Sequence, residues 1–380
     1  MPDFQLLYCA TDKELYDMLM ASKQRITETI LLGIARERGI FCSPREARES
    51  LVDYLSLLPY TYANLDTILG HRASTQRTEK RTSIRLNAAL SMDDVKAVCN
   101  EYKEGATGGD EKVVTRQEGT NKYTATINYS ELDYSKTRLL QRRQKEAEIE
   151  FFIKDNETII RMPANPKSLT VVETLKRSLD TRTKNDIPSE AIELSHLKTP
   201  EDRTTFFTSL ITSIPGYRLE TVTDIKVESK LHDHPVDEDE DEDEIDENAL
   251  EDKVAERAML SVVENIALKG QGLLSAPEYQ QLKEKGFFIT NIVWKSRQLN
   301  HPFHIIEFDA GFEEPREGKG FKYNVRGVYR NINGAHTSTL RQIPKEEKPP
   351  YFDLLEQTAR RVLRKLTAES DASTPETGQS

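Results

Sequence analysis

Cysteine is scarce in this sequence, and its spacing argues against two classes of small stabilised domain. The three cysteines, Cys9, Cys42 and Cys99, are odd in number, far apart and never arranged as Cys-x-x-Cys. A disulfide framework and a zinc knuckle both require closely spaced pairs of cysteines. We therefore expect three small buried apolar residues in a protein that works in a reducing compartment.

Long apolar runs and the motifs of common catalytic sites are lacking as well. No apolar run reaches the ~20 residues that a membrane-spanning helix needs, and residues 1–15 lack the basic segment of a signal peptide. A phosphate-binding GxxxxGK[ST] loop, an HExxH zinc motif and a GxSxG nucleophile motif do not occur. The sequence therefore predicts a cytoplasmic protein without membrane contact or cofactor, and it favours a non-enzymatic role.

Negative charge is abundant, but it is concentrated in residues 237–252. These sixteen residues include twelve acidic and no basic ones, whereas the whole chain of 380 residues has a formal charge of −11. The other 364 residues therefore carry a net charge of about +1. Such a run does not pack, because no neighbouring surface could compensate the cost of desolvating so many carboxylates. We expect residues 231–252 to form a disordered acidic linker.

The hydrophobic periodicity predicts an α+β protein with three ordered domains around this linker. The first domain is helical and covers residues 1–103. The second, over residues 120–230, combines helices with a mixed or antiparallel sheet, and the third, over residues 253–366, is an antiparallel meander flanked by helices. Residues 367–380 are rich in Ser, Thr and Glu, and we expect them to form a disordered tail.

Local patterns predict the individual elements of these domains. Thr11 and Glu14 form a capping box at the start of the first helix, and Gly39 ends a second helix that runs from Arg25 to Arg38. The other predicted elements are a flexible link at 104–119, a basic helix at 136–145, a hairpin at 148–162, helices at 250–268 and 351–366, and strands at 287–296, 303–312 and 322–329.

Residues 24–57 combine a helix, a short extended link and a second helix that opens at Ser43-Pro44-Arg45-Glu46. Ser43 is the expected cap, Pro44 presets the first turn, and Glu46 reaches back to the cap. With RERGIFCSPREARESLVDYL at its centre, this stretch resembles a SAP, or helix-extended-helix, DNA-binding motif.

The SAP resemblance implies a helical hairpin that grips phosphates through basic side chains and a helix N-terminus. The basic residues that would do so are Arg36, Arg38, Arg45 and Arg48. Acidic neighbours on both helices would cancel these charges, so the alternative is an ordinary helical hairpin that packs on its neighbours. The acidic neighbours are Glu37, Glu46, Glu49 and Asp53.

Two further segments are basic. Residues 71–85 contain Arg72, Arg77, Lys80, Arg81 and Arg85 against the single acid Glu79. In the predicted helix 136–145, basic residues at i, i+4 and i+7 would share a face. The basic residues of this second segment are Lys136, Arg138, Arg142, Arg143 and Lys145. Both segments could follow a phosphate backbone and release its counterions, or they could be ordinary solvated surface.

The nearest approach to a catalytic site is Glu307 and Asp309, which alternate on one predicted strand face. Two carboxylates with a nearby lysine could hold a metal ion for phosphodiester cleavage. The strand reads IIEFDAG, however, and no lysine follows in the E-x-K register that nucleases of this kind use.

Three functions are consistent with these patterns. The first is a non-enzymatic nucleic-acid-binding component of a larger cytosolic system, with DNA as the expected partner rather than RNA and the acidic linker as an autoinhibitor. The second is a protein-interaction adaptor whose helical N-terminus docks a protein partner or a second copy, while the acidic linker mimics nucleic acid. The third is a metal-dependent nuclease that uses Glu307 and Asp309.

Overall fold

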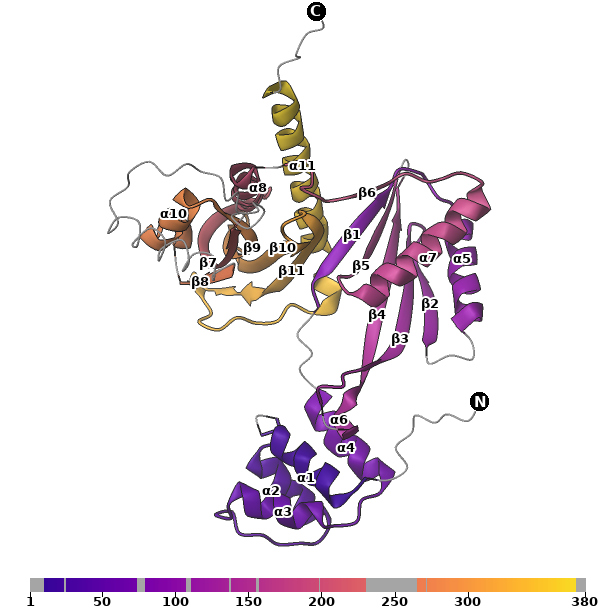
Figure 1. The fold of residues 1–380 in the computed structure, drawn as a ribbon, viewed down its shortest axis with the longest axis vertical. Helices are drawn as coiled ribbons and strands as arrows, with labels where there is room; N and C mark the ends of the chain where they lie inside the picture. Colours follow the sequence, from indigo (N-terminus) through magenta and orange to yellow (C-terminus); the bar gives the residue numbers. More distant parts are fainter. Residues whose placement is uncertain are drawn as a thin grey trace, which may run out of the picture. The chain divides into compact units, whose positions relative to one another are not determined.

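The computed structural model describes residues 10–23, 25–73, 79–106, 111–136, 138–154, 157–197, 199–229, 265–270 and 272–373 (Figure 1). The chain divides into two compact units. Unit 1 comprises Met1–Glu79, Lys96–Glu118 and Tyr123–Glu148, and unit 2 comprises Lys80–Val95, Gly119–Lys122 and Ile149–Ser380. The predicted acidic linker, residues 231–252, lies outside the described residues, and the three predicted domain boundaries stay a prediction.

The predicted α+β class is confirmed, with N-terminal helices, antiparallel strands and a C-terminal meander. The helices of unit 1 are α1 (Asp12–Ala21), α2 (Glu28–Glu37), α3 (Arg48–Ser56), α4 (Tyr62–Ala73), the short α6 (Arg138–Gln141) and most of α5 (Met92–Ala106). The predicted capping box is present, because the Glu14 backbone N–H donates to Thr11 Oγ1 and the Glu14 carboxylate accepts from the Thr11 N–H. Gly39 follows α2 in the left-handed region, as expected.

The predicted start of the third helix was wrong by four or five residues. Helix α3 begins at Arg48 after Ala47, whose side chain forms no cap. Ser43 instead closes a local turn, in which its Oγ accepts from the Arg45 N–H and its carbonyl accepts from the Glu46 N–H. The residues that predicted a helix cap form a turn in the link between α2 and α3 instead. Ser43 therefore does not precede a helix N-terminus that could bind a phosphate.

The strands of unit 1 correct two further predictions. Strand β2 (Lys112–Glu118) lies next to β3 (Lys122–Leu132), so residues 104–119 are not simply a link. Among the described residues of the predicted basic helix 136–145, only Arg138–Gln141 is helical, as α6, and the last four residues of that prediction begin strand β4 (Arg142–Ile153). The burial of Ala147, Ile149 and Phe151 explains this outcome, because these alternate residues of β4 pack one strand face into the interior.

Unit 2 contains antiparallel strands in the order β5-β1-β11-β10-β9-β7-β8, with the last residues of β4 paired to β5 (Figure 1). Their bounds are β1 (Arg81–Leu86), β5 (Thr158–Pro163), β7 (Tyr217–Ser229), β8 (Asn265–Lys269), β9 (Phe287–Gln298), β10 (Ile305–Glu314) and β11 (Lys319–Tyr329). The short β6 (Ser189–Ala191) pairs with β1 beside this order. The predicted β4–β5 hairpin and the β9–β10–β11 meander are confirmed.

Helices α7 (Pro166–Thr183), α8 (Pro200–Thr212), α10 (Pro277–Glu284) and α11 (Pro349–Ser373) complete unit 2. The core of the meander contains Trp294, Phe308 and Tyr323 together with Phe206 of α8 and Leu355 of α11. The apolar side chains of α8 and α11 thus cover one face of the meander.

The predicted C-terminal ends of two helices, 250–268 and 351–366, were wrong. Residues 265–269, expected as the end of a helix, form β8, because they pair with β7 from Asp224↔Lys269 to Glu228↔Asn265. Helix α11 continues to Ser373, so residues 367–373 are not a disordered tail. In the part of the chain that the structure describes, no helix has both the length and the apolar character needed to cross a bilayer.

Candidate functional site

The arginines predicted to grip phosphate in the helical hairpin occupy different environments. Arg48 is 4% exposed, and its guanidinium donates to the carbonyls of Ile26 (2.7 Å) and Leu19 (2.8 Å). Its charge holds α3 against the preceding segments, so a phosphate could not reach it without opening the core. Arg45 lies exposed in the α2–α3 link, where its side chain has no ion-pair partner among the described residues.

The end of the basic segment 71–85 is part of the unit 2 sheet, since residues 81–85 lie on β1. Residues 71–73 are the end of α4, and residues 74–78 lie outside the described part of the chain. Lys80 Nζ lies 2.5 Å from both Asn291 Oδ1 and Asp309 Oδ1, and Arg85 pairs with Glu157. Burial lowers the pKa of Lys80, although the Asp309 charge opposes this effect. Arg81 begins β1 opposite Tyr323 and Pro163. Arg77 and the side chain of Arg72 lie outside the described part of the chain.

The second basic segment is also engaged by carboxylates. Arg138 Nη1 lies 3.1 Å from Glu14 Oε1, and Lys145 Nζ lies 2.7 Å from Glu131 and 3.4 Å from Glu79. The helical face expected to join Arg138, Arg142 and Lys145 does not exist, because the last two residues lie on β4. Arg142 has no carboxylate within ion-pair distance in the described residues, and the side chain of Arg143 lies outside them.

The two carboxylates of the candidate nuclease site, Glu307 and Asp309, have different side-chain partners. Glu307 is buried, with Oε1 3.4 Å from Arg326 Nη1 and Oε2 accepting from Tyr329 Oη at 3.4 Å. Asp309 instead binds Lys80, so each carboxylate is neutralised by its own base. No group of three His, Cys, Asp or Glu side chains within the described ranges could hold a metal ion.

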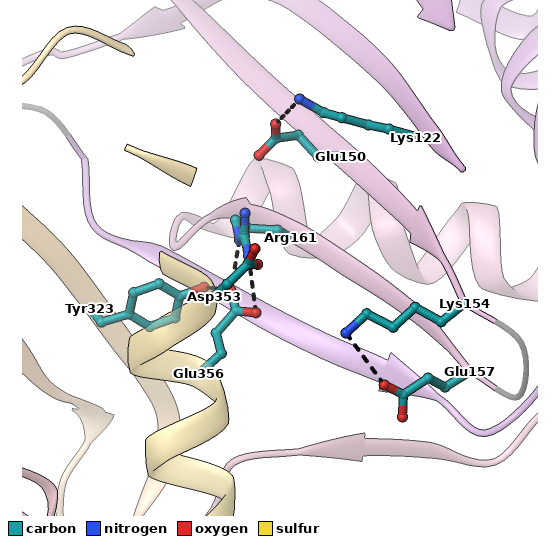
Figure 2. A network of polar contacts seen from close by, with 8 residues as sticks. All are labelled: Lys122, Glu150, Lys154, Glu157, Arg161, Tyr323, Asp353 and Glu356. Carbon is teal, nitrogen blue, oxygen red and sulfur yellow. Dashed lines mark hydrogen bonds and ion pairs between the residues drawn. The ribbon is translucent and has the colours of Figure 1, made fainter. Parts of the chain in front are cut away.

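A buried polar network joins β5, β11 and α11 (Figure 2). Arg161 is fully buried, and its Nε and Nη2 atoms donate to Glu356 Oε1 (2.7 Å) and Oε2 (3.2 Å). Nη2 also donates to Asp353, and Tyr323 donates to Glu356. The Arg161 guanidinium lies 4.8 Å from the centroid of the Phe152 ring.

Electrostatics keep the members of this network in defined states. Burial would lower the pKa of Arg161, but the charge and hydrogen bonds of Glu356 outweigh it, and the pKa is raised. Burial, reinforced by the Glu356 charge, raises the pKa of Tyr323 well above its ordinary value. Tyr323 is therefore a permanent donor and Arg161 a permanent cation, an arrangement suited to fixing α11 rather than to proton transfer.

A cleft of about 860 Å³ lies in unit 2. Side chains from β1, β5, β6, α7 and α11 line it, together with the residues that follow β6. Its apolar lining residues include Ile84, Leu86, Ile160, Val172 and Leu363. At its edge, His196 Nε2 lies 2.7 Å from Thr367 Oγ1 of α11. No pattern in the sequence indicated this cleft, because its lining residues come from segments as distant as β1 and α11.

Exposed apolar side chains occur on α3, in the links on either side of it and at the start of α4. Phe41 is 91% exposed, Tyr62 66%, Leu57 63% and Tyr54 47%. Arg38 connects these segments, because its Nη1 donates to the Pro59 carbonyl at 2.5 Å and its guanidinium lies 3.9 Å from the Tyr60 ring centroid. The link that carries Phe41 is thereby held against the turn between Leu57 and Tyr62.

No protein-family model and no curated protein matches this chain. Two solved structures of similar extent are the di-domain ARO/CYC StfQ from the steffimycin biosynthetic pathway and the di-domain ARO/CYC BexL from the BE-7585A biosynthetic pathway. The first is 9% identical, covers 77% of this chain and 99% of its own, and has a TM-score of 0.17. The second is 12% identical, covers 78% and 99%, and has a TM-score of 0.15. TM-scores this low establish neither a shared fold nor a shared function.

Proposed function

We propose that this chain is a protein-interaction adaptor, and that its N-terminal helices bind a partner protein through an aromatic surface. We define the aromatic surface as Phe41, Tyr54, Leu57 and Tyr62. The observation that supports the proposal is the exposure of all four within a stretch of 22 residues. Clustered large apolar side chains on a soluble module are typical of binding sites, and aromatic residues dominate the energetics of such interfaces.

The charges beside the aromatic surface indicate which kind of partner would complement it. The exposed carboxylates of Glu46, Glu49 and Asp53 lie on or beside α3, whereas the charge of Arg48 is buried. A polyanion such as nucleic acid would meet these carboxylates directly. A protein with an apolar groove and a basic rim would complement both the aromatic surface and its acidic border.

The test compares surface variants in a quantitative co-purification from the source cells. Phe41→Ser combined with Tyr62→Ser removes most of the exposed apolar area without touching the core. Burying one phenyl ring contributes about 1.5–3 kcal/mol, so the double variant should retain a specific partner at least about tenfold less well. Leu299→Ser, at an exposed apolar position in unit 2 (57%), is the control and should retain it fully.

Two outcomes would count against the adaptor. A partner set that is the same for the double variant and the control would remove the role of the aromatic surface. Sedimentation analysis of the purified chain tests the second-copy alternative, because a dimer that dissociates in the double variant would make the occupant another copy of this chain.

Nucleic-acid binding is the second candidate function. The observation in its favour is charge segregation, since residues 237–252 hold twelve acids and the other 364 residues sum to about +1. Arg45 and Arg142 would supply phosphate contacts that no described carboxylate already occupies. A mobility-shift titration at low salt with long duplex DNA, single-stranded DNA and RNA separates the two functions, because a flat response with all three favours the adaptor.

A further inference from the structure

The cleft in unit 2 has the size and lining of a small-molecule site. Its volume of about 860 Å³ falls within the range of roughly 300–1,000 Å³ that is typical of ligand pockets. Ile84 and Ile160 face each other across the β1–β5 pair, and Val172 of α7 and Leu363 of α11 add two further apolar side chains. An apolar body can therefore contact β1, β5, α7 and α11.

Specific contacts position the elements that form the walls of the cleft. Strand β1 pairs with β11 only at Arg81↔Tyr323, whereas its far end pairs with β6 from Ile84↔Ala191 to Leu86↔Ser189. The sheet therefore divides beyond Arg81. The Arg161–Glu356 network fixes the first half of α11, and the His196–Thr367 hydrogen bond fixes its second half.

The polar residues of the rim determine which charge the cleft favours. Three carboxylates line it, Glu173, Glu190 and Glu193, against the two bases Lys176 and Arg364. Lys176 already lies 3.4 Å from Asp180 and 3.6 Å from Asp186, neither of which lines the cleft. The rim thus has an excess of negative charge.

Glu173 and Glu193 are the carboxylates best able to meet a ligand. Within the described ranges neither lies within ion-pair distance of a base, whereas Glu190 lies 4.0 Å from Arg85 Nη1. Glu193 also raises the pKa of Lys319, but Lys319 is held more closely by Glu317, at 2.6 Å.

We propose that this cleft binds a small organic cation with an apolar body, such as an aromatic or alicyclic amine. The body contacts Ile84, Ile160 and Leu363, and the ammonium group lies at the rim near Glu173 and Glu193. This site is independent of the aromatic surface in unit 1, so either proposal can fail without the other.

Three naphthalene probes with the same bicyclic body test the charge preference. They are 1-naphthylmethylamine, 1-naphthylmethanol and 1-naphthaleneacetic acid, which at neutral pH present a cation, a neutral group and a carboxylate anion. Titration calorimetry of the full chain at neutral pH should show the amine binding most tightly, with the anion weakest. Because the rim is solvent-exposed, the advantage of the amine over the alcohol should be about fivefold and should shrink at high salt.

Variants locate the binding site. Glu173→Gln with Glu193→Gln should lower the affinity for the amine about fivefold and leave that for the alcohol unchanged. Glu284→Gln, an exposed acid on α10 far along the chain from the rim, is the matched control and should change neither. Ala368→Trp places an indole at the cleft from an exposed position of α11, so it should weaken all three probes.

Three results would overturn the proposal. Tightest binding of the 1-naphthaleneacetic acid anion would show that the ligand class is wrong. Affinities unaffected by Ala368→Trp would show that the probes bind elsewhere. A lack of binding by every probe at millimolar concentration would show that the cleft is not a site for this class.

Discussion

Replacing Arg161 by methionine should destabilise unit 2 severely, and a second substitution should partly restore it. Methionine fills the space of the arginine stem but removes the guanidinium that holds Glu356 and Asp353. Glu356 has only 3% of its side chain exposed, so its carboxylate would stay buried without a cation. Removing one partner of such a pair costs about 3–5 kcal/mol, most of it from the stranded charge.

The informative comparison is the double variant Arg161→Met with Glu356→Gln. The amide of glutamine is neutral and still accepts the hydrogen bond from Tyr323. The double variant should therefore be about 2 kcal/mol more stable than Arg161→Met alone, although it has lost more of the native network. Arg297→Met is the surface control. Its guanidinium is 49% exposed and lies 2.6 Å from Glu220, so its loss should cost at most about 1 kcal/mol.

The single tryptophan provides a local probe for this experiment. Trp294 is fully buried in the same core as Tyr323 and Leu355, so its fluorescence during urea unfolding reports on unit 2. The four proteins are the unmodified chain, Arg161→Met, the double variant and Arg297→Met. When their free energies of unfolding depend equally on urea concentration, their unfolding midpoints give the differences in free energy of unfolding. A double variant less stable than Arg161→Met would falsify the stranded-charge account, as would a loss below about 1 kcal/mol in Arg161→Met itself.

Four further predictions can be tested on the purified chain. Arg48→Met should lower the stability of the N-terminal helices by about 2–3 kcal/mol, measured by circular dichroism, whereas Arg45→Met should leave it unchanged; equal effects would contradict the burial of Arg48. Burial raises the pKa of the Cys99 thiol to about 12, so at pH 8 an aromatic disulfide reagent should label Cys42 and spare Cys99 in the folded chain, as located by mass spectrometry. Since that pKa is above the unfolded value of 9.0, the contribution of Cys99 to stability should be complete below pH 9 and be lost as the pH rises towards 12. Under the nucleic-acid alternative, deleting residues 237–252 should tighten DNA or RNA binding at low salt, and an unchanged affinity would remove the autoinhibition idea.

Local signals in the sequence were sufficient for many of the elements. The Thr11 capping box, the hairpin of β4 and β5 and the three strands of the meander all depend on residues a few positions apart. Such signals failed where a competing local structure used the same residues. Ser43 has the side chain of a helix cap, yet it caps a turn, and the helix starts only where Leu51, Val52 and Leu55 can reach the core.

The candidate site residues were harder to judge from the sequence, because charge alone does not reveal availability. Lys80 and Arg85 looked like free cations in a basic segment, yet both are held by carboxylates of unit 2. The cleft could not be predicted, since its lining is assembled from β1, β5, β6, α7 and α11. The exposure of Phe41 was equally hidden, because an apolar residue next to two helices is normally assigned to a core.

The sequence by itself determined the α+β class and the concentration of negative charge in one segment, since both depend on composition and short-range periodicity. Only the tertiary structure decided which charged side chains already have a hydrogen-bond or ion-pair partner. Arg48 bonds a carbonyl 22 residues away, Arg161 a carboxylate 195 residues away and Lys80 a carboxylate 229 residues away. Pairing at that separation depends on how the strands and helices assemble, because a buried charge must find its partner in space rather than along the chain.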